Sequence, residues 1–105
     1  MINVIFTESD GLICGFELSG HSGYAESGSD IVCSAVSSAA LMAANTVIEI
    51  QNLNPDITVN DGFLSLNLSK QEAQTAKVIL DGLKLHLTAL SKEYSEFIKV
   101  KISEV

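Results

Sequence analysis

Residues 30–51 read DIVCSAVSSAALMAANTVIEIQ, and this run decides how the rest of the chain has to be arranged. Most of its positions are apolar, while Ser34, Ser38, Asn45 and Glu49 fall on one narrow polar stripe at helical spacing. A helix that is apolar over so much of its surface must be covered by other elements on most sides. The polar residues within the run favour a helix buried in a folded domain over a membrane span.

Both ends of this helix carry recognisable signals. Asp30 stands directly before the apolar pattern, and aspartate is a preferred N-cap residue. The helix is expected to run from Asp30 to about Gln51. It ends in the segment 52–55, Asn-Leu-Asn-Pro, because proline disfavours helical backbone in the residue that precedes it.

Before the helix, the sequence predicts a β-hairpin. Residues 2–8 alternate apolar and polar side chains, and Asp10-Gly11 supplies a tight turn that tolerates positive φ. A second strand follows, with its predicted core face formed by Leu12, Cys14, Phe16 and Leu18. We therefore expect Cys14 to pack in the core.

After the helix, the same order of elements returns. Strands over 57–60 and 63–68 flank a second Asp-Gly turn, and a second helix begins at Ser69 or Lys70. The apolar stripe of that helix is Ala76, Ile79, Leu80, Leu83, Leu87 and Leu90. Residues 96–105 alternate again and predict a closing strand.

The element order ββαββαβ predicts an α+β fold, a two-layer sandwich in which two helices cover one face of a mixed β-sheet. Nothing in the 105 residues resembles a linker, so residues 1–105 are expected to form a single domain.

Composition narrows the class of protein. Thirteen acidic residues against six basic ones give a net charge of −7, which disfavours direct nucleic-acid binding and favours a basic partner. Two cysteines are too few for a disulfide framework or a cysteine-rich zinc site, and no metal or organic cofactor is expected. The sequence shows no secretory leader pattern, so we expect a cytoplasmic protein without membrane attachment.

The segment that carries chemistry joins the second strand to the first helix. Capped by Asp30, the helix would hold Cys33 in its first turn, where free N–H groups and the helix dipole stabilise a thiolate. His21 precedes it across a glycine-rich loop and could act as its base. Free N–H groups near Val32 and Cys33 are expected to hold the developing oxyanion.

Plainer interpretations of these residues remain open. Cys33 shares a helical face with Val36, Ala40 and Val47 and could be an inert core cysteine, and His21 could be an ordinary loop residue. His86 beside the second apolar stripe is expected to be a structural or surface histidine. Asp30 could cap the helix, steady His21, or do both.

The run GHSGYAESGSDIVCSAVSSAA over residues 20–40 resembles the signature of the Prp family of ribosomal-processing cysteine proteases, GHxGYxxxGxDIVCAAVS. Ser34 replaces the commoner alanine. The resemblance implies a catalytic Cys33 and His21 with Asp30 beside them. Substrate contacts are expected from the motif and its loop, namely Gly20, Ser22, Gly23, Tyr24, Gly28 and Ser34.

The same resemblance implies a cysteine endopeptidase that removes the N-terminal extension of a large-subunit ribosomal protein, the twenty-seventh in its series. It also implies a homodimer, with a loop over residues 22–29 that orders when substrate binds. The alanine-rich first helix could supply the dimer contact or pack only within the monomer. Two alternatives stay open: a non-catalytic module of ribosome assembly, and another cysteine-dependent hydrolase.

Overall fold

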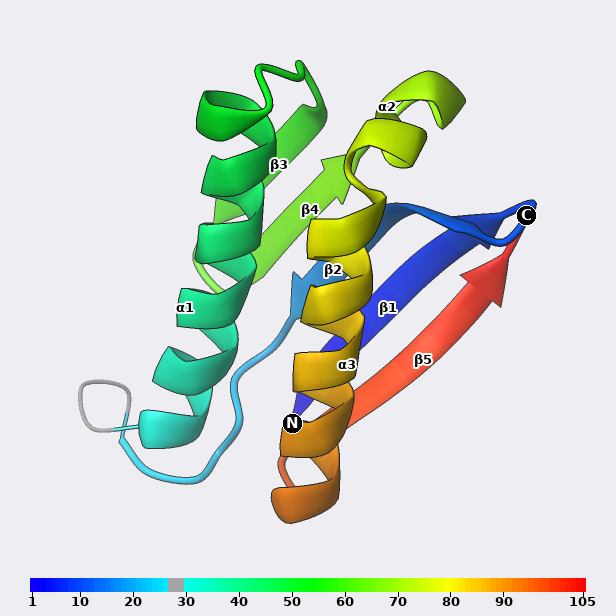
Figure 1. Ribbon diagram of the computed structural model, residues 1–105. Helices are drawn as coiled ribbons and strands as arrows, with labels where there is room; N and C mark the ends of the chain where they lie inside the picture. Colours follow the sequence, from blue (N-terminus) through cyan, green and yellow to red (C-terminus); the bar gives the residue numbers. More distant parts are fainter. Residues whose placement is uncertain (27–29) are drawn as a thin grey trace.

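The computed structural model describes residues 1–26 and 30–105 and forms two layers, a sheet and a pair of long helices (Figure 1). The elements are β1 (Ile2–Ser9), β2 (Leu12–Ser19), α1 (Ile31–Asn45), η2 (Thr46–Ile50), β3 (Asp56–Asn60), β4 (Phe63–Asn67), α2 (Lys70–Thr75), α3 (Lys77–Glu93) and β5 (Ile98–Glu104). The predicted α+β class is confirmed. The strands follow the expected order, and both helical regions are subdivided.

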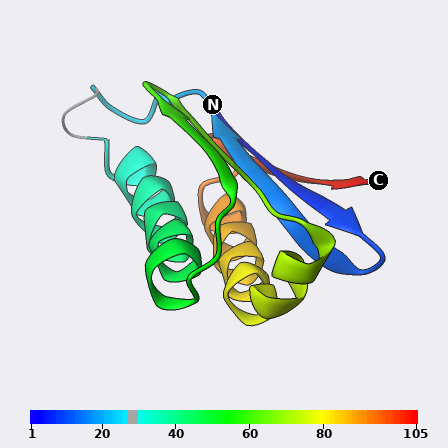
Figure 2. The ribbon, with the colours of Figure 1, turned by 90° about the horizontal axis from the view of Figure 1, so that it is seen from above.

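The sheet is mixed, with strand order β3-β4-β2-β1-β5. Only β1 and β5 pair in parallel; the other three pairings are antiparallel. The first turn has the predicted conformation, with φ of 53° at Asp10 and 79° at Gly11. Seen from above, α1 and α3 lie on the same face of the sheet, as the sequence predicts (Figure 2).

The core fills the space between the sheet and the two long helices. Phe6 and Phe16 form its centre, with ring centroids 6.3 Å apart and both side chains almost fully buried. The predicted stripe of the second helical region packs here, through Ala76, Leu80, Leu83 and Leu87, with Ile79 and Leu90 at its margin. Burial of these apolar side chains is the main stabilising contribution to the fold.

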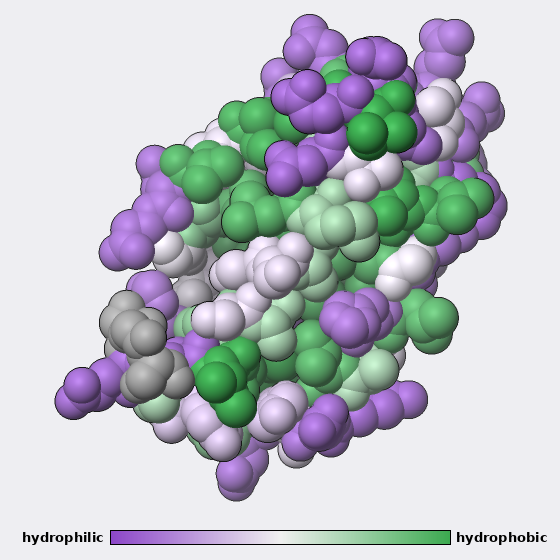
Figure 3. Space-filling model, turned by 60° about the vertical axis from the view of Figure 1, so that its left-hand side comes forward, coloured by the Kyte–Doolittle hydropathy of each residue, from purple (hydrophilic) through white to green (hydrophobic). Residues whose placement is uncertain are grey.

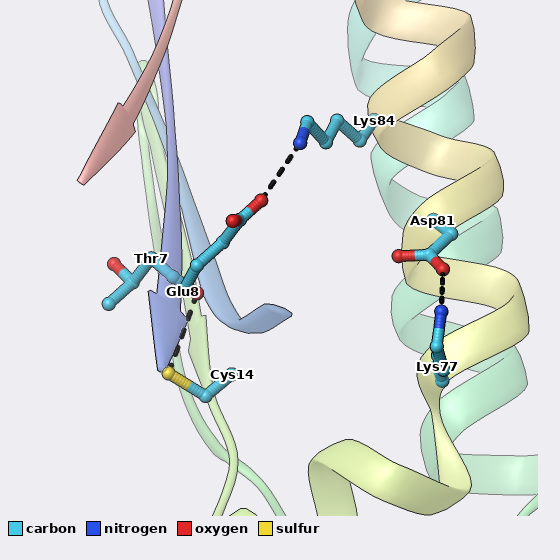
Figure 4. A network of polar contacts seen from close by, with 6 residues as sticks. All are labelled: Thr7, Glu8, Cys14, Lys77, Asp81 and Lys84. Atoms are coloured by element: carbon cyan, nitrogen blue, oxygen red, sulfur yellow. Dashed lines mark hydrogen bonds and ion pairs between the residues drawn. The ribbon is translucent and has the colours of Figure 1, made fainter. Parts of the chain in front are cut away.

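The prediction that Cys14 lies in the core is wrong. A β-bulge shifts the register between Thr7 and Glu8, so that Thr7 pairs with Gly15 while Glu8 pairs with Ile13. The extra residue is Cys14, which stays half-buried, and Ile13 enters the core in its place. Its thiol lies 3.4 Å from the carbonyl oxygen of Thr7 (Figure 4).

The long apolar helix ends differently from the prediction. Regular α-helix stops at Asn45, and a π-helical turn, η2, carries the chain to Ile50. The hydroxyl of Thr46 donates to the carbonyl of Met42 at 2.8 Å, which competes with the regular helical hydrogen bonds. A single π turn leaves no mark on apolar periodicity, so the sequence pattern continues through it.

Residues 31–50 are long and apolar enough to cross a membrane by length and composition alone. In the structure this segment packs against the sheet and α3 instead, with Val32, Val36 and Val47 almost completely buried. About a third of the apolar window in this segment is buried, so the prediction that other elements cover the helix on most sides is wrong.

The second helical region is interrupted at Ala76, where φ is −87° and ψ is 4°. Contacts from a distant segment fix the short helix α2 before the break. The side-chain amide of Gln51 donates to the carbonyl of Thr75, and the backbone N–H of Asn54 donates to Glu72, both at 3.0 Å. These contacts are long-range, which is why local spacing predicted one continuous helix.

Candidate active site

A cavity of about 470 Å³ opens where the start of α1 faces the turn between β3 and β4. Both Cys33 and His21 line it, although one lies on a helix and the other follows a strand. The second cysteine, Cys14, and the second histidine, His86, lie elsewhere. Tertiary structure therefore brings together the two residues that the sequence paired.

Cys33 combines the two environments that the sequence left open. It lies in the first turn of α1, is half-buried and packs against the core cluster. Its sulfur also faces the cavity and accepts a hydrogen bond from the backbone N–H of Ser22, with 3.3 Å between nitrogen and sulfur. The hydrogen bond fixes the position of the Cys33 sulfur relative to the segment that carries His21.

His21 lies at the other side of the cavity, on the backbone that leaves β2. A Cβ atom at Gly62 would lie only 3.0 Å from the His21 Nε2, so the imidazole occupies space that a glycine leaves free. Gly20 N–H donates to the Gly62 carbonyl at 2.9 Å, and the amino terminus of Met1 donates to the His21 carbonyl at 2.5 Å. The main chain on both sides of the imidazole is therefore held by the second hairpin and the chain start.

Within the described residues, no hydrogen bond joins the His21 ring to Cys33 or to Asp30. Hydrogen bonds of this kind are often long before substrate binds and tighten in the reacting complex. The arrangement is that of an open cavity with the thiol and the imidazole on its walls.

Asp30 is the N-cap of α1, as predicted from the sequence. One carboxylate oxygen, Oδ1, accepts from the N–H groups of Val32 and Cys33 at 3.0 Å each. The other, Oδ2, accepts a short hydrogen bond from the Ser22 hydroxyl. The side chain is 4% exposed. Asp30 thus ties the helix start to the segment that carries His21.

Two effects oppose each other on this carboxyl. Burial raises the pKa of Asp30, but hydrogen bonds from the Ser22 hydroxyl, from Cys33 and from the Val32 N–H together lower it below its ordinary value. The group is therefore a carboxylate at neutral pH.

The expected oxyanion donors are not available. The N–H groups of Val32 and Cys33 are the very groups that Asp30 accepts from, so the prediction that they are free is wrong. A capping side chain and an oxyanion compete for the same first-turn donors.

The remaining motif residues differ in position. Gly20 and Gly23 line the cavity. Ser22 is 3% exposed, and its hydroxyl accepts from the Tyr24 N–H at 3.0 Å while donating to the carboxylate of Asp30. In this arrangement its hydroxyl is bound within the protein instead of facing a ligand.

Two other predicted substrate contacts lie outside the cavity wall. The Tyr24 ring packs edge-on against Phe97 and Tyr94, with centroids 5.2 and 6.0 Å away. Ser34 is exposed beside a groove on the outer face of α1. Gly28 lies outside the described residues, so the structure does not describe it.

Sequence reasoning missed the residues that form the rest of the cavity. Ser37 lies one helical turn after Cys33, a spacing that could have indicated it. The hairpin tip, residues 59–63, comes from the second half of the chain. No sequence motif near it indicates that it lies beside Cys33 and His21. Only the folded sheet places it beside the first half.

The model of the family described as cysteine protease Prp matches residues 1–99. The chain belongs to the cysteine protease Prp family. It is therefore a cysteine protease, and the alternatives of an inert assembly module or another kind of hydrolase are set aside.

Two curated Prp proteins are each 29% identical to this chain over the aligned residues. The ribosomal processing cysteine protease Prp of Bacillus subtilis is 29% identical over 94 residues, covering 84% of each chain. The Prp of Staphylococcus aureus strain Mu50 is 29% identical over 103 residues, covering 95% of this chain and 97% of its own.

Solved structures agree over nearly the whole length. The S. aureus Prp crystal structure with a covalently linked product peptide has a TM-score of 0.91 at 28% identity, covering 98% of this chain and all of that one. The protein SMU.848 from Streptococcus mutans has a TM-score of 0.86 at 26% identity, covering 100% and 96%. The S. aureus protein thus holds a covalently linked product peptide on the same fold.

Proposed function

We propose that this Prp family member is an endopeptidase that removes the N-terminal extension of a large-subunit ribosomal protein, the twenty-seventh in its series. The observation that carries the proposal is the shared cavity. Of the two cysteines and two histidines in the chain, Cys33 and His21 are the pair that line it. The curated relatives are named for ribosomal processing, which supports the choice of substrate.

In the proposed reaction, the Cys33 sulfur attacks the scissile carbonyl carbon and a C–S bond forms. His21 takes the thiol proton and delivers it to the nitrogen of the leaving amine as the C–N bond breaks. Water, deprotonated by His21, then attacks the thioester, and the regenerated thiol and a new carboxyl group complete the cycle. Asp30 holds the helix start and Ser22 in place, while Gly20 and Gly23 leave room for the peptide backbone.

The proposed protein substrate also fits the charge of the chain. Ribosomal proteins and their tails are basic, and the net charge of −7 attracts them while repelling nucleic acid. We place the reaction in the cytoplasm, where ribosomal proteins are assembled. No metal or organic cofactor has a part in this chemistry.

We further propose a homodimer that uses the outer face of α1. The alanines of this helix that are buried, Ala40, Ala43 and Ala44, pack within the monomer. Apolar side chains on its outer face are exposed instead, among them Leu41, Met42 and Ile50. Figure 3 shows hydrophobic residues gathered on this side of the molecule. An exposed apolar surface of this kind is typical of a protein contact.

The deciding experiment incubates the protein with the full-length ribosomal protein that carries the extension. Mass spectrometry of the products should show removal of the extension by the wild type and no cleavage by Cys33→Ala. A ribosomal protein produced without the extension is the control and should stay intact. Equal cleavage by Cys33→Ala would end the assignment of Cys33, and no cleavage by the wild type would end the assignment of this substrate.

A further inference from the structure

One of the two edge strands of the sheet, β3, ends at the proposed active site. It pairs with β4 on one side only, and all five of its residues are exposed. Among the described residues, no backbone hydrogen bond reaches its free edge. An unpaired edge of this kind can accept a further strand.

The register of β3 reveals an apolar surface beside this edge. Ile57 pairs with Leu66 and Val59 pairs with Leu64, and directly paired residues of antiparallel strands point to the same face. Leu64 and Leu66 are buried under the helices. Ile57 and Val59 face the same layer, yet they are 40% and 61% exposed. The helices therefore stop short of β3, and we call Ile57 and Val59 the β3 shelf.

The β3 shelf continues into the cavity. Val59 belongs to the shelf and also lines the cavity. Asn60, at the end of the strand, lines the cavity too, as does Leu41 of α1, which lies between the cavity and the outer groove of that helix. A chain that followed β3 would therefore pass directly from the shelf to the walls that carry Cys33 and His21.

We propose that the substrate binds as an additional, sixth strand along β3, with alternate side chains lying on the β3 shelf. This inference rests on the proposed peptidase function and specifies how the substrate is held. Backbone groups of the peptide would pair with the free edge of β3 and supply affinity. The shelf would select apolar side chains at every second position, because successive residues of a strand point to opposite faces.

Charge also favours a basic peptide over a second copy of this chain. Asp56 and Asp61 flank the strand, and no ion pair involves either of them among the described residues. Two copies paired antiparallel through β3 would bring the Asp56 of each close to the Asp61 of the other. Like charges near one another across a strand pair are destabilising. A peptide with lysine or arginine near the ends of the paired segment would be attracted instead.

The test is an N-methyl scan of the peptide that spans the cleavage junction of the extended ribosomal protein. Each backbone nitrogen is methylated in turn, and kcat and KM are measured with the wild-type protein. Pairing along β3 predicts that KM rises about tenfold at every second position and little at the positions between them. A scan without this alternation would overturn the proposal.

A matched pair of variants locates the contact. Val59→Asn should raise KM about tenfold and leave kcat nearly unchanged, because it removes apolar contact with the substrate. Val78→Asn is the control, since Val78 is 84% exposed on α3 and does not line the cavity. Equal KM values for Val59→Asn and the wild type would also overturn the proposal.

Two further outcomes are distinguishable. If the unmodified peptide is not cleaved by the wild type, the proposed function fails, and the scan is repeated as binding to Cys33→Ala by fluorescence anisotropy. The alternation in affinity then decides the strand proposal alone. If Val59→Asn abolishes a concentration-dependent dimer in sedimentation experiments and the scan is flat, a second copy occupies β3 and the peptide proposal is wrong.

Discussion

The chain contains two hairpin–helix units whose connections differ. In the second unit, two residues join β4 to α2, and Ser69 and Glu72 form a complete local capping box. In the first unit, residues 20–30 join β2 to α1, and the cap, Asp30, also accepts from Ser22 eight residues earlier. The short connection only begins a helix. The long one begins a helix and also brings a histidine and a cysteine to one cavity.

This difference shows where a small domain can place chemistry. The two hairpins and helices supply a core that holds the ends of the long connection. Among the described residues of the connection, His21 is exposed, while Ser22 and Asp30 are buried and hydrogen-bonded to each other. Each prediction below compares a residue in the first connection, or in the helix turn that follows it, with a residue of similar type elsewhere in the chain.

The largest expected difference in activity is between the variants of the two cysteines. Cys33→Ala should lower kcat/KM by about 10³-fold or more, because no other thiol reaches the cavity. Cys14→Ala, at the β-bulge, should leave kcat/KM within about twofold of the wild type. Loss of activity in Cys14→Ala with a normal melting temperature would contradict this comparison.

The two histidines should differ nearly as much. His21→Ala removes the proposed proton carrier and should lower kcat by about 10²- to 10⁴-fold. His86→Ala, on the exposed side of α3, should leave the kinetics unchanged. Steady-state rates with the junction peptide measure both, and comparable losses in the two variants would show that His21 has no special part.

Variants of Ser22, which binds the cap Asp30, and of Ser69, which is itself a cap, compare the two helix starts. Ser22→Ala removes the hydroxyl that binds Asp30, so the Ser22 N–H should move away from the sulfur and kcat should fall on the order of tenfold. The rate of Cys33 alkylation by iodoacetamide should change in this variant because the surroundings of the sulfur change, and Ser22→Thr should restore the wild-type rate.

Ser69→Ala removes a cap remote from the cavity. It should lower the free energy of unfolding by about 1 kcal/mol and leave kcat and the alkylation profile unchanged. Urea unfolding measures the first quantity. A change in alkylation by Ser69→Ala would mean that the two connections are coupled through the core.

The smallest effect concerns acid stability. The pKa of Asp30 is lowered in the folded protein, so its contribution is fully present above its ordinary value of 3.8 and is lost as the pH falls through the lower folded value. The pKa of Glu72 is lowered as well, first by the Ser69 N–H and then by the Asn54 N–H. Asp30→Asn and Glu72→Gln should each flatten the decline of stability in this acidic range.

The variants of these two carboxyl groups should differ in catalytic activity. At neutral pH, Asp30→Asn should also lower kcat. The amide has a single acceptor oxygen, so it cannot accept both from the helix N–H groups and from the Ser22 hydroxyl. Glu72→Gln should leave kcat unchanged. Thermal unfolding from neutral to acidic pH, together with rates at neutral pH, measures both effects.

Local patterns in the sequence were sufficient for much of this molecule. Alternating side chains and Asp-Gly turns predicted both hairpins, and apolar spacing predicted the face of each helix that is buried. The Asp30 cap and the position of Cys33 in the first helical turn followed from the same local rules. These features depend on residues within a few positions of one another, which is why the sequence alone determined them.

Tertiary structure decided the rest. The bulge that removes Cys14 from the core, the break at Ala76 and the use of the Val32 and Cys33 donors by Asp30 all depend on neighbouring segments. The cavity is completed by the tip of the second hairpin, about thirty residues after Cys33 in the chain. Only the pairing of β4 with β2 brings that hairpin beside the His21 ring, and such long-range contacts leave no periodic trace in the chain.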